Sequence, residues 1–304
     1  MEQANNSAAT APRITVAWWN SSLAPRGISR ESSPLREAAA VVVVHLVVEK
    51  KVDFIALGEM SESDLAYMRE SLSMPGWVWE SGICSVGKAV YDICYAYNSA
   101  VFVFAGLEEI TDTSAGRTLR VAQQVNLVEL YSGTAIVVLA SHWPSRRNLS
   151  EHHPCRDLLG VRLRDAARAV KLSDNSKPHL ILLGDYNDEP FSASLSEQLM
   201  ASRDKNHVRK VGHLFYNPFW SYLGERADNE SAPLGSYYWK QGAITRWLTL
   251  DQIIFSSNFI SGENWLLCEK GSRLVDIPEL TNLVKGSGSE FDHVPVYATI
   301  EKVE

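Results

Sequence analysis

Carboxylate, amide and imidazole side chains occur in this sequence where short apolar runs begin or end. The segment Gly184-Asp185-Tyr186-Asn187-Asp188 follows one such run, and Asp292-His293 directly precedes another near the C-terminal end of the chain. Glu59 comes shortly after the end of the apolar run at residues 52–57. A strand end fixes a side chain on a rigid element yet leaves it accessible at the rim of a sheet. These positions are therefore candidates for metal ligands and for groups that transfer protons.

Each candidate also has an ordinary structural explanation. Asn20 could cap a helix or belong to a turn, and the Asp- and Asn-rich segment that begins at Asp185 could be a turn as well. Glu59 could be a solvated loop acid, and His142 a surface histidine with a hydrogen-bond partner. Asp251 precedes an apolar run, so burial with a partner would account for it. The site hypothesis therefore depends on the whole set and not on any one residue.

The set as a whole suits the hydrolysis of a phosphate ester. A hard cation such as Mg²⁺ binds one or two carboxylates and keeps water and phosphate oxygen as its other ligands, and Glu59 and Asp292 suit that task. Asp185 could orient or deprotonate the attacking water. Histidines such as His142 and His293 can donate hydrogen bonds to phosphoryl oxygens, and an Asp bonded to the other ring nitrogen would fix the tautomer.

The composition predicts a folded protein with a large core. The chain has 304 residues, of which 45% are hydrophobic, including 9 Trp and 11 Tyr, and this excludes disorder for the chain as a whole. We expect residues 13–304 to form a single domain, because large two-sheet folds often reach this length. The formal net charge of −7 argues against tight passive coating of nucleic acid. It does not exclude a nuclease, because a bound metal supplies positive charge where the bond is cut.

The N-terminal segment and the cysteines indicate a cytoplasmic protein. Residues 1–12 lack basic residues and an apolar stretch, so we expect a disordered leader and no signal peptide. The valine-rich run at residues 41–48 is too short to span a bilayer and predicts a buried helix or strand, so no membrane partner is expected. The 4 cysteines form no CxxC pair, and we expect buried free thiols and no disulfides: Cys84, Cys94, Cys155 and Cys268.

The chain alternates short β-type runs with helical segments. Residues 13–19, 52–57, 135–140, 179–183, 248–255 and 294–300 read as strands, and several shorter β-type runs lie between residues 77 and 126. Residues 35–51 and 155–172 read as helices. The apolar face expected for the second helix consists of Leu158, Val161, Leu163, Ala166, Ala169 and Val170.

Taken in order, the candidate motifs resemble the endonuclease/exonuclease/phosphatase superfamily, whose fold is that of deoxyribonuclease I. The resemblance extends from about residue 13 to residue 300. The motifs are Trp19-Asn20, Gly58-Glu59, Ser141-His142-Trp143-Pro144-Ser145-Arg146, Gly184-Asp185-Tyr186-Asn187, Leu250-Asp251-Gln252-Ile253 and Asp292-His293-Val294-Pro295-Val296. The sequence departs from the usual pattern at Gly58, where Gln is common, at Tyr186, where Phe is more frequent, and at Phe291, where Ser is common. None of these departures removes a group thought to be essential.

The resemblance implies a four-layer α/β sandwich in which two packed, mixed β-sheets are flanked by helices. It implies Glu59 as the principal ligand of Mg²⁺ or Mn²⁺, helped by Asn20 and Asp292. It further implies that Asp185 positions or activates water and that Asn187 contacts a phosphate oxygen. His293, oriented by Asp251, would polarise the phosphate, and His142 would act from the opposite side.

Several sequence features favour a nuclease that cleaves DNA or RNA over the alternatives. Ser145 and Arg146 follow His142 at a spacing similar to that of nuclease members, which makes them candidate substrate-binding residues. Arg156, Arg162, Arg164 and Arg168 make the following segment basic, although most could form the solvated face of a helix. A phosphatase or phosphodiesterase for small phosphate esters is the alternative that the acidic charge favours, and an inactive binding module is a remote one. Among the aromatic residues between 213 and 247, Tyr238 and Trp239 are the best candidates for stacking on bases.

Overall fold

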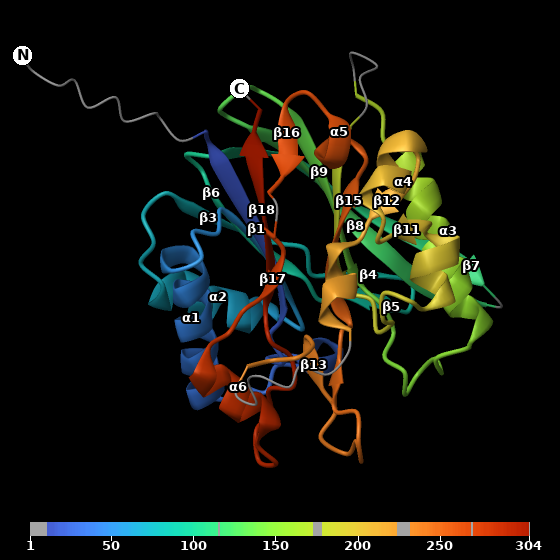
Figure 1. Ribbon diagram of the computed structural model, residues 1–304. Coiled ribbons are helices and arrows are strands. Elements are labelled where there is room, and N and C mark those ends of the chain that lie inside the picture. Colours follow the sequence, from blue (N-terminus) through green and yellow to red (C-terminus); the bar gives the residue numbers. More distant parts are fainter. Residues whose placement is uncertain (1–10, 115, 173–177, 224–231, 269, 304) are drawn as a thin grey trace, which may run out of the picture.

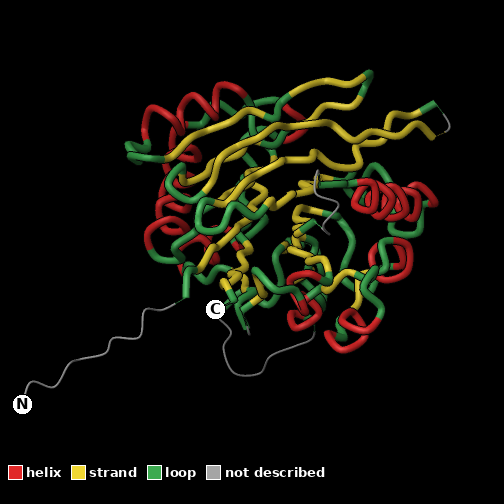
Figure 2. Tube along the Cα trace, turned by 90° about the horizontal axis from the view of Figure 1, so that it is seen from above, coloured by secondary structure: helices red, strands yellow, loops and turns green. Residues whose placement is uncertain are grey.

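The computed structural model describes residues 11–114, 116–172, 178–223, 232–268 and 270–303. Residues 1–10 of the expected N-terminal leader lie outside the described residues. The described chain forms two large β-sheets that pack face to face, with helices on both outer sides (Figure 1). Figure 2, a view from above, shows the helices in red around the strands in yellow. The expected four-layer α/β sandwich is confirmed.

The first sheet contains seven strands and is mixed. β1 and β2 run parallel, and the other neighbours are antiparallel. In spatial order the strands are β16 (Trp265–Leu267), β18 (Val296–Lys302), β1 (Arg13–Asn20), β2 (Phe54–Gly58), β6 (Cys94–Asn98) and β3 (Trp77–Ser81), with β17 (Arg273–Leu274) beside β18.

The second sheet also contains seven strands and is also mixed. Here β10 runs parallel to β9 and antiparallel to β15, so the C-terminal ends of β9 and β10 meet the beginning of β15. In spatial order the strands are β11 (Ala201–Ser202), β12 (Phe215–Tyr216), β15 (Asp251–Ser256), β10 (His179–Asp185), β9 (Ala135–His142), β8 (Arg117–Glu129) and β7 (Phe102–Ser114). Two small ribbons, β4 (Cys84–Val86) with β5 (Ala89–Tyr91) and β13 (Tyr237–Tyr238) with β14 (Trp247–Leu248), complete the strands.

The helices divide between the outer faces of the two sheets. α1 (Ser33–Val48), α2 (Glu62–Ser71) and α6 (Pro278–Lys285) pack with the first sheet. α3 (Pro154–Ala169) and η2 (Ser194–Gln198) pack with the second. The remaining short helical segments are η1 (Pro25–Gly27), α4 (Lys205–Lys210), η3 (Pro218–Tyr222) and α5 (Asn258–Ser261).

Alternation along the strands explains why the chain forms layers. In β1, Val16 and Trp18 face the core between the two sheets, whereas Ala17 and Trp19 face the core beneath α1. Successive side chains of a strand point to opposite faces, so a strand that is apolar at every position can fill two cores at once. β10 does the same, with Ile181 on the central core and Leu182 against α3.

The valine-rich run at residues 41–48 forms the second half of α1, but the expectation that it is buried is only partly correct. Val42 and Val43 are buried, whereas Val41, Val44 and Val48 are exposed by 67%, 39% and 49%. A helix on the outside of a sheet buries only one stripe of its surface, so a run of valines longer than one turn must place some of them outside.

The expected inner face of the second helix is only partly correct: Leu163 is buried and Leu158 and Val170 pack against the same core, whereas Val161, Ala166 and Ala169 do not. In α3 the sheet covers Cys155, Arg156, Leu159, Leu163 and Ala167, and of the expected face only Leu163 is fully buried. The buried guanidinium of Arg156 donates to the backbone carbonyls of Pro144, Leu149 and Ser150. Arg156 therefore fixes the loop between β9 and α3.

All four cysteines are free, as expected, although only Cys94 and Cys155 are fully buried. Within the part of the chain that the structure describes, no helix has the length and apolar character needed to cross a membrane.

Candidate active site

Three candidate residues lie side by side at one edge of the second sheet. In the pairing of β9 with β10, His142 is the partner of Asp185, and in the pairing of β10 with β15 the partner of Asp185 is Asp251. Gly184 allows this arrangement, because it has φ +155° and a Cβ there would lie 1.9 Å from the carbonyl oxygen of Ser141. The sheet register itself therefore assembles His142, Asp185 and Asp251.

The first sheet brings a second group to the same edge. β1 ends at Asn20, which is paired with Gly58 at the end of β2, so Glu59 is the next residue along the chain. Asn20 Nδ2 donates to Asp185 Oδ2 over 3.3 Å and connects the two sheets. Glu59 has φ +52°, a conformation that is unfavourable for this residue type, and its carbonyl accepts hydrogen bonds from Ala24 and Ser21. The surrounding backbone thus holds Glu59 in place.

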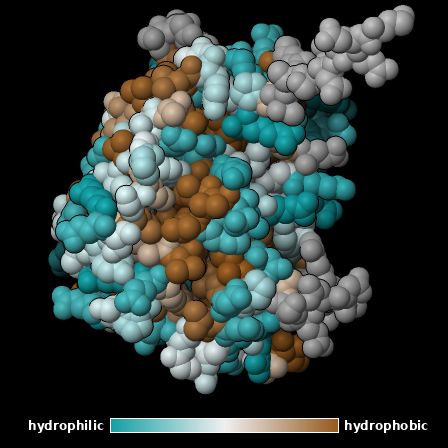
Figure 3. Space-filling model, turned by 90° about the vertical axis from the view of Figure 1, so that its left-hand side faces the viewer, coloured by the Kyte–Doolittle hydropathy of each residue, from teal (hydrophilic) through white to brown (hydrophobic). Residues whose placement is uncertain are grey.

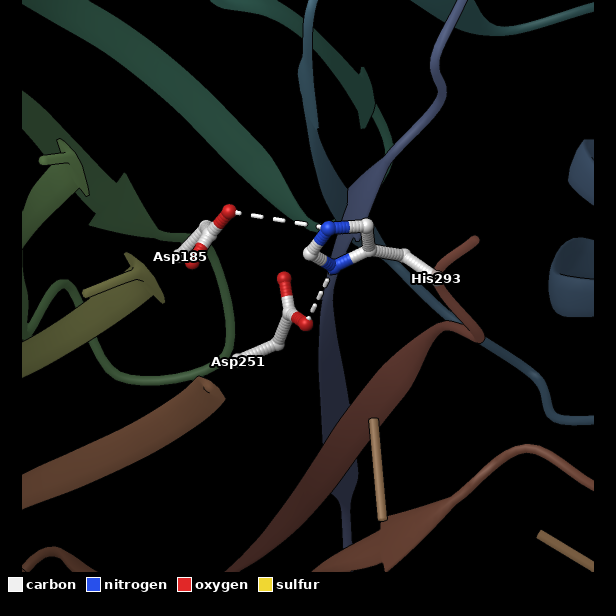
Figure 4. A group of neighbouring side chains, drawn as sticks. All are labelled: Asp185, Asp251 and His293. Atoms are coloured by element: carbon white, nitrogen blue, oxygen red, sulfur yellow. Dashed lines mark hydrogen bonds and ion pairs between the residues drawn. The ribbon is translucent and has the colours of Figure 1, made fainter. Parts of the chain in front are cut away.

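Asp251 and His293 form a hydrogen-bonded pair (Figure 4). His293 Nδ1 lies 2.7 Å from Asp251 Oδ2, and the indole of Trp18 donates to the other oxygen of Asp251 over 2.7 Å. His293 Nε2 points to the site, 3.8 Å from both Asp185 Oδ2 and Asp292 Oδ1. Burial alone would lower the pKa of His293, but Asp251, Asp292 and Asp185 together raise it well above its usual value. These three carboxylates therefore favour the protonated form of the His293 ring, which donates hydrogen bonds.

A second acid–histidine pair faces the first and was missed in the sequence. His142 Nδ1 lies 2.9 Å from Asp92 Oδ1, and Arg120 is 3.3 Å from the same oxygen. Burial opposes a charge on His142, but Asp92 outweighs it and raises the pKa of His142. Asp92 follows the short strand β5 and belongs to no recognisable motif. No local signal in the sequence could have identified it.

Glu59 faces both histidines and has no partner of its own. Among the described residues, its carboxylate makes no hydrogen bond and no ion pair. Burial raises the pKa of Glu59, while the fields of His142 and His293 act in the opposite direction. Asp292 lies nearby and accepts a hydrogen bond from Ser22 over 3.1 Å. A partly buried carboxylate without a partner is costly unless something positive binds to it, so this corner of the site suits a cation.

Asp185 and Asn187 form a tight turn at the end of β10. The backbone N–H of Asn187, which has φ +52°, donates to Asp185 Oδ1 over 2.8 Å. Burial and the neighbouring charge of Asp251 raise the pKa of Asp185, in spite of the two histidines. The amide of Asn187 donates to the carbonyl of Trp143 over 3.1 Å, which leaves its second N–H for a further acceptor.

A family model described as the Endonuclease/Exonuclease/phosphatase family matches residues 84–302 of the sequence. The chain belongs to this family.

Solved structures of low sequence identity share the fold over nearly the whole chain. The catalytic domain of human Nocturnin, with bound sulfate, has a TM-score of 0.61 at 15% identity and covers 96% of this chain and 94% of that one. ANGEL2, a 2′,3′-cyclic phosphatase in complex with adenosine-2′,3′-vanadate, has a TM-score of 0.60 at 15% identity and covers 96% of each chain. A humanized D. rerio TDP2 has a TM-score of 0.58 at 17% identity and covers 95% of this chain and 99% of that one. No curated protein matches the sequence.

Two of the three departures from the usual endonuclease/exonuclease/phosphatase pattern have structural explanations. Phe291 stacks on Trp19, with ring centroids 5.7 Å apart. Tyr186 is fully buried and packs edge-on against Trp143, but its hydroxyl has no hydrogen-bond partner among the described residues, so the packing does not explain Tyr in place of Phe. Gly58 lies against the ring of Trp18, so that a Cβ would approach within 2.8 Å of it. The departures therefore adapt the packing beneath the site and leave its polar groups in place.

The loop after β9 places Arg146 beside the site. Arg146 Nε donates to the carbonyl of Asn187 over 2.9 Å, and a second nitrogen of its guanidinium lies 3.5 Å from Glu151. Ser145 is partly buried, and its carbonyl accepts the N–H groups of Asn148 and Leu149. Ser145 therefore shapes the loop through its backbone, whereas the guanidinium of Arg146 is next to the Asp185 turn.

The other arginines of this segment have structural partners. Arg156 is buried, and Arg162 pairs with Asp112 over 2.7 Å. Arg164 donates to the carbonyl of Gln198 over 2.9 Å, and Arg168 contacts the sulfur of Met200. These side chains hold α3 in place and do not form a basic stripe directed at the site.

Tyr237, and not Tyr238, presents its ring to His293. Its ring centroid lies 4.8 Å from that of His293. Tyr238 is buried against Trp247, with its hydroxyl bonded to Arg246. The preference for Tyr238 is therefore wrong: side chains alternate along a strand, so neighbouring positions of β13 face opposite ways.

Proposed function

We propose that this protein is a divalent-metal-dependent phosphodiesterase that cleaves nucleic acid. The observation that carries the proposal is the convergence, at one edge of the sandwich, of two acid-supported histidines with Asp185 and the unpartnered Glu59. Phosphate hydrolysis requires positive charge at the non-bridging oxygens and a base near the attacking water. The arrangement supplies groups for both tasks.

Glu59, Asp292 and Asn20 would hold the metal. Carboxylate and amide oxygens form a hard donor set that suits Mg²⁺ or Mn²⁺, and among the described residues no cysteine joins them. When bound, the ion supplies charge stabilisation at the phosphoryl oxygens. Asp185, Asp251 and His293 also bring ligand atoms within 4.8 Å of one another. However, Asp251 and His293 already bond to each other, so we assign the ion to the Glu59 side.

The remaining residues act on water and phosphate. Asp185, whose raised pKa makes it a stronger base than an ordinary carboxylate, orients or deprotonates the attacking water. His293 and His142 hold protons on the nitrogens that face the site and donate them as hydrogen bonds to phosphoryl oxygens from opposite sides. Asn187 contributes a further N–H. Asp251 and Asp92 fix the orientation of the two rings.

Several features support nucleic acid as the substrate class. Arg146 can bind a backbone phosphate adjacent to the cleaved one, and Tyr237 presents a ring beside His293 on which a base can stack. Among the structural neighbours, D. rerio TDP2 has been solved in complex with a single-strand DNA product. A single-stranded segment would allow its bases to reach Tyr237. The four cysteines are free, which is consistent with the expected location in the reducing cytoplasm.

A small phosphate ester is the second candidate substrate. The net charge is −7, and the arginines of α3 are engaged in structural contacts, so the surface offers little to a long polyanion. ANGEL2, which shares the fold, is a 2′,3′-cyclic phosphatase. Both candidates use the same catalytic groups and differ only in how far the substrate extends beyond the cleaved phosphate.

Cleavage assays on matched substrates test the proposal. Single- and double-stranded DNA, RNA, a nucleoside 2′,3′-cyclic phosphate and a small aryl phosphodiester should each be incubated with Mg²⁺, with Mn²⁺ and with EDTA. We expect cleavage of nucleic acid that needs the metal and is absent from an Asp185→Ala variant purified in the same way. Full activity in excess chelator would overturn the metal-dependent mechanism. Turnover confined to the small esters would assign the protein to the second class.

A further inference from the structure

Two opposite charges are buried together next to the candidate active site. They belong to Arg156, in α3, and to Asp188, in the turn after β10, and the side chain of each is only 1% exposed. Arg156 Nη1 lies 3.5 Å from Asp188 Oδ1. Neither of these two atoms has a hydrogen-bond partner among the described residues, so each depends on the charge of the other.

A buried ion pair of this kind requires an explanation. Exposed hydrophobic residues, such as those shown in brown in Figure 3, are ordinary on a protein surface, whereas a fully buried charged residue is rare unless it is paired. Burial raises the pKa of Asp188 to about 6, and the charge of Arg156 has the largest effect in the opposite direction. Removing either partner would leave the other buried without its counter-charge, so the two side chains hold their positions together.

Arg156 anchors the loop at residues 143–150, which joins β9 to the start of α3. Its Nε and Nη2 atoms donate to three backbone carbonyls between residues 144 and 150, at distances from 2.7 to 3.2 Å. The same loop carries Arg146 to the edge of the site. The guanidinium therefore connects this loop to α3 and keeps one nitrogen for Asp188.

Asp188 is anchored on two further sides. Ser194 Oγ, in η2, donates to Asp188 Oδ2 over 2.5 Å. Gln252 Nε2 donates to the carbonyl of Asp188 over 2.7 Å, and Gln252 is the neighbour of Asp251 in β15. One residue thus joins α3, η2 and β15 directly behind the polar groups of the site.

The turn at residues 185–187, which immediately precedes Asp188, carries groups that we assign to the reaction. The backbone N–H of Asn187 donates to Asp185 Oδ1 over 2.8 Å, and the side-chain amide of Asn187 donates to the carbonyl of Trp143 over 3.1 Å. Arg146 Nε donates to the carbonyl of Asn187 over 2.9 Å. A displacement of Asp188 would therefore move the backbone that makes these contacts.

We propose that Asp188 is a positioning residue of the active site, whose ion pair with Arg156 locks the 185–187 turn to the 143–150 loop. This inference rests on the proposed function, because it concerns the same site. Asp188 acts through the turn and touches no reacting group, so its loss changes how Asp185 and Asn187 are aimed at water and phosphate. A misplacement of about 1 Å in such groups can lower the rate about 100-fold.

Asp188→Asn tests the proposal, because it removes the charge and keeps the shape of the side chain. On the substrate that the wild type cleaves fastest, kcat should fall about 10- to 100-fold, the usual cost of losing a group that orients others. KM and the Mn²⁺ concentration for half-maximal activity should stay nearly unchanged, because Glu59 and Asp292 are attached to the first sheet.

Hydrogen–deuterium exchange gives a readout that needs no activity. The backbone N–H of Trp143 donates to the carbonyl of Asp185 over 2.9 Å, and that of Asn187 donates to the carboxylate of the same residue. Both amides should exchange faster in Asp188→Asn, because the turn and the loop open more often.

Ser194→Ala is a second, milder variant. It removes the hydroxyl that donates to Asp188 and leaves the ion pair with Arg156 intact, so it keeps the proposal testable if Asp188→Asn does not fold. We expect changes in the same direction, in kcat and in the exchange of the Asn187 amide, and smaller than those in Asp188→Asn.

Glu129→Gln is the matched control for stability. Glu129 is fully buried, and its carboxylate accepts hydrogen bonds from the indole of Trp265 over 3.1 Å and from the backbone N–H of Thr134 over 2.9 Å. It lies at the opposite end of β9 from His142. The control should lower the melting temperature but leave kcat and the exchange at residues 185–187 as in the wild type.

Two outcomes would overturn the inference. The first is wild-type kcat and wild-type exchange in both Asp188→Asn and Ser194→Ala. The second is a loss of kcat in Glu129→Gln as large as that in Asp188→Asn at an equal loss of melting temperature, which would make Asp188 a residue for stability alone. A wild type that hydrolyses no phosphate ester would instead overturn the proposed function, and the exchange at residues 185–187 would still decide whether Asp188 holds the turn.

Discussion

The imidazole of His142 is bonded through Nδ1 to the carboxylate of Asp92, 2.9 Å away, although fifty positions separate the two residues in the chain. Arg120 contacts the same carboxylate oxygen over 3.3 Å. Together with Asp251 and His293, this pair gives the site two acid–histidine units that approach from opposite sides.

Asp92→Asn should lower kcat/KM by about 10- to 100-fold, the usual cost of losing a group that orients a ligand or proton donor. Because Asp92 raises the pKa of His142, the substitution should lower that pKa, so activity should be lost at a lower pH than in the wild type. The pH profile of kcat/KM and the NMR titration of His142 measure the shift. Asp112→Asn, which removes a carboxylate from an exposed ion pair, serves as the control. An unchanged pH profile for Asp92→Asn would contradict the assigned role.

Asp251 and His293 should act as one unit, so their losses should not add. His293→Ala should cost about 2.7–4 kcal/mol of transition-state stabilisation, as is common for a preorganised donor at a reacting oxyanion. Asp251→Asn should cost less, because the ring remains and only its orientation and tautomer change. The double variant should resemble His293→Ala alone. Additive losses in kcat/KM would instead mean that Asp251 is a structural residue or a ligand for a second metal.

Glu59→Gln and Asp185→Asn should separate metal binding from turnover. Glu59→Gln keeps the shape of the side chain but removes its charge, so the metal concentration needed for half-maximal activity should rise about ten-fold or more. Asp185→Asn should leave that midpoint nearly unchanged and lower kcat. Calorimetric titration with Mn²⁺ and activity at saturating metal measure the two effects. Equal shifts of the metal midpoint in both variants would reverse the assignment of the two carboxylates.

His179 should make the protein sensitive to acid. Burial lowers its pKa to about 4 from an ordinary value of 6.5, and its ring packs edge-on against Phe259. The folded state therefore binds the proton less readily than the unfolded chain. Stability is unaffected above pH 6.5 and is lost as the pH falls from 6.5 towards 4, by up to about 3 kcal/mol.

His179→Phe removes this titration and keeps an aromatic ring beside Phe259. Its advantage in urea unfolding over the wild type should therefore grow between pH 7 and pH 4. A constant difference across that range would show that His179 is not the group responsible.

The sequence by itself determined the fold class and most of the polar groups at the site. Apolar runs that alternate with turns are local features, and the residues that follow them, such as Glu59 and Asp185, must lie at the ends of strands. Two neighbouring parallel strands then bring such residues to one sheet edge, as β9 and β10 do with His142 and Asp185. The order of the motifs along the chain supplied the resemblance to a family that the family model confirms.

Only the tertiary structure decided which side chains face each other. Asp92 could not be found in advance, because its pairing with His142 depends on how β5 lies against β8 and not on any spacing in the chain. The choice between Tyr237 and Tyr238 depended on the register of β13, where a shift of one residue exchanges the two faces. The rotation of α1 depended on packing, which buries Val43 and exposes Val44. A sequence fixes which residues are apolar, whereas only the assembled sheets fix which of them face the core.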